Sequence, residues 1–385
     1  VIGIAILAGF APLLARVALN FNSPEYFSLM VLGLLIAALV GEGSQFRSLA
    51  MVVLGLLLGI VGIDVTSGYP RFTFGVWELR EGINLVVITT GLFGIAEVMA
   101  NAGRITGQMT DPKTITWRSM VPTRTDMRLA WPAALRGTGI GAVVGALPGT
   151  GAALATFVSY AVEKRVARDP SRFGKGAVEG LVGPEAANNA AAQTAFVPTL
   201  SLGIPGDAIV AIMLGALIIH GVVPGPRLIV DNPSLFWGLT VSFLIGNVIL
   251  VVLNLPLIGL WIRILLIPYR LLYPAVIVFI AIGVYSINNS AFDVAMAMLF
   301  GIVGYGMRLL GFSPAPLLLG LVLGPLMESN LRRSLIISRG DLTVFIERPI
   351  SAACLGVALL LIAALVGSEL SRRRRRMATA AVEPD

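Results

Sequence analysis

The chain has 385 residues, of which 56% are hydrophobic and only 13% are charged, and its mean hydropathy is +0.88. This composition provides far less polar surface than a soluble globular protein of this length requires, so it excludes a soluble enzyme or soluble binding protein. The formal net charge is +7, but the basic residues lie in loops between apolar stretches. That distribution is typical of the positive-inside bias of membrane proteins and argues against a nucleic-acid partner. One cysteine, Cys354, and one histidine, His220, argue against a disulfide, a metal centre or any other bound cofactor.

Apolar runs of the length that crosses a bilayer recur along the chain. We expect such segments at 1–19, 26–40, 49–63, 83–100, 235–255, a proline-bounded piece at 256–267, 274–287, 292–310, 314–326 and 350–366. The sequence therefore predicts an all-α polytopic membrane protein with about nine to eleven transmembrane or re-entrant helical segments, some of them broken by glycine and proline.

Changes in composition divide the chain into five parts. We expect N-terminal transmembrane helices over 1–100, which begin in the middle of an apolar run as if a preceding part were missing, and a basic cytoplasmic loop over 101–136. A region of broken helices follows over 137–226, and further transmembrane helices occupy 227–370. The basic tail, 371–385, is predicted to be cytoplasmic, whereas 327–349 stays unassigned because one crossing separates it from the tail.

Basic clusters lie on both sides of the apolar stretch 137–162. If both clusters are cytoplasmic, the stretch between them cannot cross the membrane completely. Pro148 and Gly149, near its centre, are the residues at which the chain is expected to reverse. We therefore predict a re-entrant helical hairpin.

Glycines recur every four residues at Gly137, Gly141, Gly145 and Gly149, which on a helix form a smooth stripe for close packing. Packing alone is the simplest interpretation of that stripe. The broken backbone at 147–151 adds a second one, because amides that begin a new half-helix bind carboxylates. On this basis we predict a substrate-binding contribution from Pro148, Gly149, Thr150 and Gly151.

A second unusual stretch runs from 184 to 206. Asn188 and Asn189 lie in an apolar region, where polar side chains are costly unless they have a partner, and interhelical hydrogen bonding is the alternative to a binding role. The chain breaks again at Gly203-Ile204-Pro205-Gly206, and paired discontinuous segments favour a transporter site. The predicted substrate residues here are Asn188, Asn189, Ser201, Pro205 and Gly206, and the predicted ion ligands, for Na⁺ at the same locus, are Asn188, Ser201 and Gly203.

A series of motifs identifies a family resemblance. The runs that carry it are Leu147-Pro148-Gly149-Thr150-Gly151, Phe173-Gly174-Lys175-Gly176, Pro184-Glu185-Ala186-Ala187-Asn188-Asn189-Ala190, Leu202-Gly203-Ile204-Pro205-Gly206 and His220-Gly221-Val222-Val223-Pro224-Gly225-Pro226. Together they resemble the large membrane subunit of tripartite tricarboxylate transporters, the TctA family.

The resemblance implies a multi-pass permease of the bacterial inner membrane, not an enzyme. It further implies two partners, a periplasmic solute-binding protein and a small membrane subunit, and import of tricarboxylates or related carboxylates with a Na⁺ or H⁺ gradient. Two alternatives stay open from the residues alone, an ion channel and a structural membrane subunit that does not transport. An intramembrane enzyme is disfavoured because His220 has no nucleophile at motif spacing.

Overall fold

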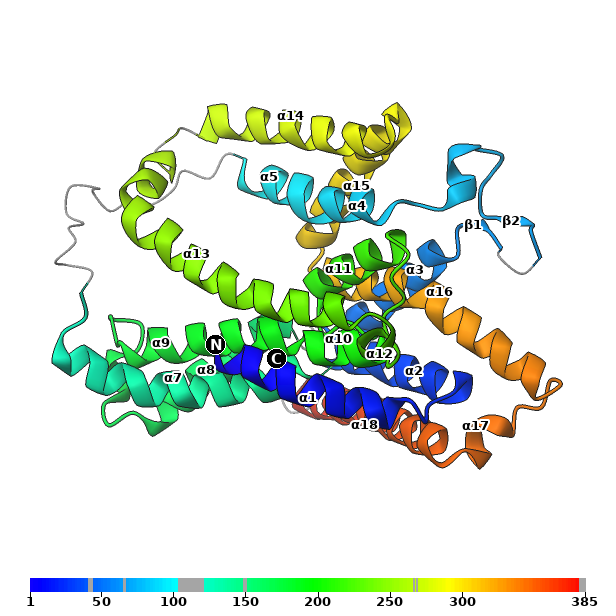
Figure 1. The fold of residues 1–385 in the computed structure, drawn as a ribbon, viewed down its shortest axis with the longest axis horizontal. Coiled ribbons are helices and arrows are strands. Elements are labelled where there is room, and N and C mark those ends of the chain that lie inside the picture. Colours follow the sequence, from blue (N-terminus) through cyan, green and yellow to red (C-terminus); the bar gives the residue numbers. More distant parts are fainter. Residues whose placement is uncertain are drawn as a thin grey trace.

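The computed structural model describes residues 1–40, 44–64, 67–102, 121–147, 151–265, 267 and 269–380. Most of this part of the chain is helical, as the sequence predicts (Figure 1). The first helices are α1 (Ile2–Ala18), α2 (Ser23–Val40) and α3 (Gln45–Gly59), followed by a short hairpin of β1 (Gly62–Ile63) and β2 (Pro70–Arg71) and by η1 (Glu78–Glu81). The next helix has three sections, α4 (Leu85–Thr89), the π-helical η2 (Thr90–Ile95) and α5 (Ala96–Asn101).

The middle of the chain contains the predicted broken helices. They are α7 (Arg124–Gly145), α8 (Gly151–Val166), the short η4 (Pro170–Arg172), α9 (Glu179–Thr194), α10 (Phe196–Leu202), α11 (Ala208–Ile219) and α12 (Leu228–Asp231). The remaining helices are α13 (Pro233–Leu265), α14 (Tyr269–Asn288), α15 (Ala291–Leu309), α16 (Pro314–Ile337), α17 (Val344–Glu347) and α18 (Pro349–Ala380).

Four helical stretches in the described part of the chain are long and apolar enough to cross a membrane: Pro233–Ile258, Leu271–Asn288, Ala291–Leu309 and Pro349–Gly367. Five shorter apolar helices accompany them, at Ile2–Ala18, Ser23–Leu39, Gln45–Gly59, Leu85–Asn101 and Ile209–Ile219. The expected fold class, an all-α polytopic membrane protein, is therefore confirmed.

The helix bounds differ from the expected segment bounds at three places. The region 101–136, predicted as a basic cytoplasmic loop, contains the start of α7 at Arg124, where Thr123 and Asp126 form a capping box. The hydrogen bonds from Thr123 lower the pKa of the Asp126 carboxyl. Pro256 does not separate two segments but lies inside α13, since ending a helix in lipid would leave more backbone groups without partners than one proline does. Within the predicted tail, α18 continues to Ala380.

Backbone contact between α7 and α9 organises the middle of the chain. A Cβ atom at Gly137 would lie 2.0 Å from the carbonyl oxygen of Gly183, and one at Gly141 would lie 2.1 Å from that of Ala187. At Gly145 it would lie 2.5 Å from the Cα atom of Ala191. The residue numbers increase in the same direction along α7 and along α9, so the two helices run parallel. The packing interpretation of the glycine stripe is thus confirmed for these three glycines, whereas Gly149 lies outside the described residues.

The same device recurs elsewhere. A Cβ atom at Gly55 of α3 would lie 2.0 Å from the carbonyl oxygen of Leu317 in α16, and one at Gly320 would lie 2.4 Å from that of Val52. In η2, a Cβ atom at Gly91 would lie 2.5 Å from the carbonyl oxygen of Ala297 in α15. Small residues let helix backbones approach closely where lipid provides no hydrophobic drive for association.

The ends of the helices opposite the start of α7 are held by ion pairs. Arg332 in α16 pairs with Asp64 after β1 at 2.8 Å, and Arg71 in β2 pairs with Glu328 at 2.7 Å. The hydrogen bond to Glu328 raises the pKa of the Arg71 guanidinium. These contacts place the β hairpin and the end of α16, within the unassigned segment 327–349, at one end of the molecule (Figure 1).

We predict that Gly141→Ala lowers the apparent melting temperature of the purified protein by several degrees, because overpacking typically costs about 1–3 kcal/mol. Gly139→Ala on the same helix is the matched control, since no heavy atom lies within 4 Å of a Cβ there. Its stability should be unchanged or slightly raised by the better helix propensity of alanine. Equal melting temperatures for the two variants would contradict the close packing of α7 on α9.

Candidate functional site

The helices α7 and α8 form an antiparallel hairpin, as the sequence predicts. Near its base Arg136 donates to both carboxylate oxygens of Glu163, with Nη2 at 2.6 Å and Nε at 2.9 Å. The Glu163 side chain is 1% exposed, so this pair joins the two legs inside the protein. The tip joins Leu147 to Gly151, and Pro148, Gly149 and Thr150 between them lie outside the described residues.

Gly151 begins α8 with a left-handed backbone, at a φ of 68°, which favours glycine. A Cβ atom on Gly151 would lie 3.5 Å from the Cβ of Asp207, the residue that follows the second break. The structure therefore places the second break beside the end of the first, although the two are separated by more than fifty positions in the sequence.

The second break, Gly203 to Gly206, is buried. Gly203 ends α10 with a φ of 73°, and its amide donates to the carbonyl of Thr199 at 3.0 Å. The amide of Ile204 donates to the carbonyl of Pro198, and that of Gly225 donates to Leu200. Irregular backbone at membrane depth is tolerated only inside protein or beside water, and this segment satisfies that requirement.

Asp207 is the functional candidate that the sequence reasoning missed. It caps α11, where its Oδ1 atom accepts from the amide of Val210 at 2.8 Å, and its side chain is half-buried. An aspartate between a Pro-Gly break and an apolar run is a recognisable helix start, so the sequence held a signal for the cap. The sequence held no signal for the contact of Asp207 with Gly151, because the two residues are far apart in the chain and meet only in the folded protein.

Ser201 lies inside the protein core. Its side chain is completely buried, and its hydroxyl donates to the carbonyl of Val197 one turn earlier in α10. Asn188 lies thirteen residues before it, or about 20 Å along the helix axis. The two side chains therefore lie on different parts of the α9–α10 segment, and the ion site expected at Asn188, Ser201 and Gly203 stays a prediction.

The two asparagines lie on the exposed side of α9. The amide nitrogen of Asn189 donates to the carbonyl of Glu185 at 2.9 Å, which uses one donor within its own helix. Asn188 and Ala195 are seven positions apart, so they share one helix face. Gly206 packs on Ala195, where a Cβ atom would lie 2.6 Å from the alanine Cβ. The face that carries Asn188 thus leads towards the second break without reaching it.

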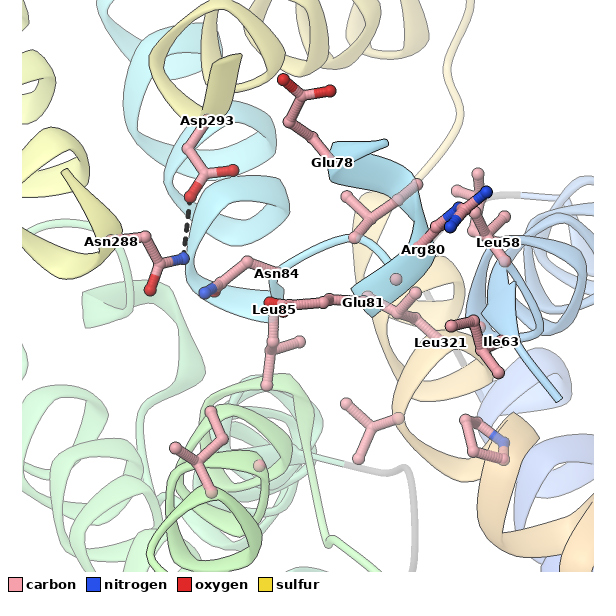
Figure 2. A pocket seen from close by; sticks show the side chains of 18 of the residues that line it. Leu58, Ile63, Glu78, Arg80, Glu81, Asn84, Leu85, Asn288, Asp293 and Leu321 are labelled. Atoms are coloured by element: carbon pink, nitrogen blue, oxygen red, sulfur yellow. Dashed lines mark hydrogen bonds between the residues drawn. The ribbon is translucent and has the colours of Figure 1, made fainter. Parts of the chain in front are cut away.

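A separate cavity of about 880 Å³ lies near the β hairpin, between η1, the far half of α11, the α14–α15 turn and α16 (Figure 2). Its polar lining includes Glu78, Arg80, Asn84, Asn288 and Asp293, and Asn288 donates to Asp293 at 2.8 Å. Among the described residues, none that the sequence predicts as a site residue lines it. The cavity and the junction of the breaks therefore occupy different ends of α11.

The fold and its buried backbone breaks define a multi-pass α-helical membrane protein of the kind in which discontinuous helices meet inside the bundle. The profile of the Tripartite tricarboxylate transporter TctA family matches residues 1–319, and the chain belongs to that family.

Two relatives from Agrobacterium vitis support the assignment. One, described as "Uncharacterized 52.8 kDa protein in TAR-I ttuC' 3'region", is 50% identical over 371 residues, which cover 96% of this chain and 73% of the relative. The other, described as "Uncharacterized protein in TAR-II ttuC' 3'region", is 55% identical over 234 residues, 60% of this chain and 97% of its own length. No solved structure matches the chain.

The contact between the breaks can be tested by disulfide formation. In a Cys354→Ser background, which removes the single native thiol, we expect Gly151→Cys and Asp207→Cys to cross-link on mild oxidation. The separation of 3.5 Å between the two Cβ positions suits the roughly 3.5–4.5 Å between Cβ atoms in a disulfide. Gly139→Cys with Asp207→Cys is the control and should stay reduced on a mass-shift gel. Absence of the first cross-link would contradict the junction.

Proposed function

We propose that the chain is the large permease subunit of a secondary transporter that imports tricarboxylates or related carboxylates. The single observation that carries this proposal is the junction of Gly151 and Asp207, which places the start of α8 and the start of α11 side by side. Helix starts carry unpaired amides and partial positive charge, which suit a carboxylate. Family membership supports the assignment to tricarboxylate transport.

Within this proposal, the substrate contacts Gly151, Pro205 and Gly206, together with Pro148, Gly149 and Thr150, which lie outside the described residues. Asn188 lies on the helix face that leads to Gly206 through Ala195. Exposed polar residues at membrane depth face water or protein rather than lipid, so this face of α9 is a suitable wall for a route to the junction. Asn189, also on the exposed side of α9, contributes to the same wall of the route.

Asp207 supplies a reason for ion coupling. Its carboxylate lies where we place an anionic substrate, and two like charges in a poorly hydrated site repel each other. A Na⁺ ion or a proton bound together with the substrate offsets that repulsion. We therefore propose symport, with the ion near Asp207.

The orientation follows from charge. We propose that the end of the molecule with the start of α7 and the 164–175 cluster is cytoplasmic and that the β hairpin faces the periplasm of a bacterial inner membrane. The helix α18 begins at the β-hairpin end, beside the Arg348–Glu25 ion pair. Because α18 crosses the membrane from there, the C-terminal tail is then cytoplasmic. A periplasmic solute-binding protein delivers the carboxylate to the end of the molecule that carries the β hairpin, and a small membrane subunit completes the transporter.

The decisive test of function is uptake of labelled di- and tricarboxylates by the full three-component system in proteoliposomes. We expect saturable uptake that requires the binding protein and an inward Na⁺ or H⁺ gradient. A conductance that needs neither would instead favour an ion channel, and absence of any flux would favour a structural subunit.

In the same assay we expect Asn188→Ala to reduce uptake roughly tenfold, since a hydrogen bond to a charged group is worth about 1.5–3 kcal/mol. Asn254→Ala is the control, because Asn254 is also an exposed asparagine in a helix, and its amide donates to the carbonyl of Leu250 at 2.8 Å. Membrane insertion should be normal for both variants. Equal uptake by the Asn188 variant and the control would remove Asn188 from the route.

A further inference from the structure

Six basic side chains are exposed at the base of the α7–α8 hairpin, and the function proposed above gives them no ligand: Arg124, Arg128, Lys164, Arg165, Arg168 and Lys175. We refer to these six residues as the basic collar. Other charges at this end are occupied locally. Arg172 pairs with Glu179 at 3.3 Å, and the carboxylate of Asp169 accepts from the amide of Ser171 at 3.0 Å.

An apolar stripe starts within the collar and continues along α7 towards the tip of the hairpin. It consists of Met127, Trp131, Leu135 and Val143, which are 49%, 63%, 47% and 68% exposed. All four side chains are exposed, so no described helix covers the stripe. Along this helix, basic residues come first, then a tryptophan, then aliphatic side chains. This order is typical of a helix that passes from the headgroups of an anionic leaflet into the acyl chains.

We infer that the basic collar binds the headgroups of anionic phospholipids, with Trp131 at the interface and Leu135 and Val143 against the acyl chains. The chemistry is that of a phosphate diester beside several guanidinium and ammonium groups, each of which contributes attraction near a charged surface. The alternative occupant, a membrane protein partner, would explain the apolar stripe but not the surplus of positive charge beside it.

This placement also sets the depth of the hairpin. Trp131 and Leu147 are sixteen positions apart, or about 24 Å along a helix. Half of a hydrocarbon core is about 15 Å thick. A hairpin that enters along the membrane normal from an interface at Trp131 therefore carries its tip past the midplane, where a solute that approaches from the opposite side can reach it.

The test is stepwise binding of phosphatidylglycerol to the delipidated full chain, measured by native mass spectrometry. We expect Arg165→Gln with Arg168→Gln to raise the dissociation constant roughly thirtyfold, since each of the two cations near the surface contributes about 1 kcal/mol. Arg333→Gln with Arg339→Gln removes two exposed charges at the opposite end and should leave the constant unchanged. The charge-conserving pair Arg165→Lys and Arg168→Lys should retain binding, which separates loss of charge from misfolding.

Phosphatidylethanolamine and inorganic phosphate serve as the competing ligands. Neither should displace phosphatidylglycerol at equal concentration. Equal effects of the two glutamine pairs, or displacement by inorganic phosphate, would overturn the assignment of the collar to anionic lipid. The readout is lipid binding rather than transport, so its failure is distinguishable from failure of the proposed transport function.

Discussion

Along α7, three glycines bring the helix backbone into direct contact with the backbone of α9, and similar contacts join α3 to α16 and η2 to α15. In a bilayer, apolar side chains gain little by leaving lipid, so close backbone approach is a principal source of helix association. The position of the hairpin tip depends on this contact, because α7 and α9 run parallel and both end near the breaks. Even one methyl group on Gly141 would require the helices to separate.

The same contact explains why irregular backbone can exist in the centre of the molecule. The second break lies in a core that includes Leu202 and Ile204 together with residues of α2, α3 and α16. Because three carbonyls at the end of α10 already accept backbone amides, this break is a finished structural element rather than a loose loop. What distinguishes the junction chemically is the nearby Asp207 carboxylate, and the repulsion between it and an anionic substrate provides a physical reason for coupling substrate to a cation.

Much of this arrangement could be predicted from sequence, because its signals are local. Charge bias on both sides of 137–162, with Pro148 and Gly149 between them, predicts the hairpin, and the four-residue glycine spacing predicts its packing. The contact of Gly151 with Asp207 could not be predicted, since nothing in either segment specifies the other. The exposed position of Asn188 was also hidden, because a polar residue in an apolar run reveals its cost but not the direction in which it points.

The central claim is that the junction of the two breaks, and not the cavity near the β hairpin, holds the carboxylate. A cryo-electron microscopy map of the transporter in nanodiscs with a saturating tricarboxylate tests this directly. The account predicts density for the ligand beside the contact of Gly151 with Asp207, next to the start of α8. Density between Asn84 and Asp293 instead, with none at the junction, would contradict it.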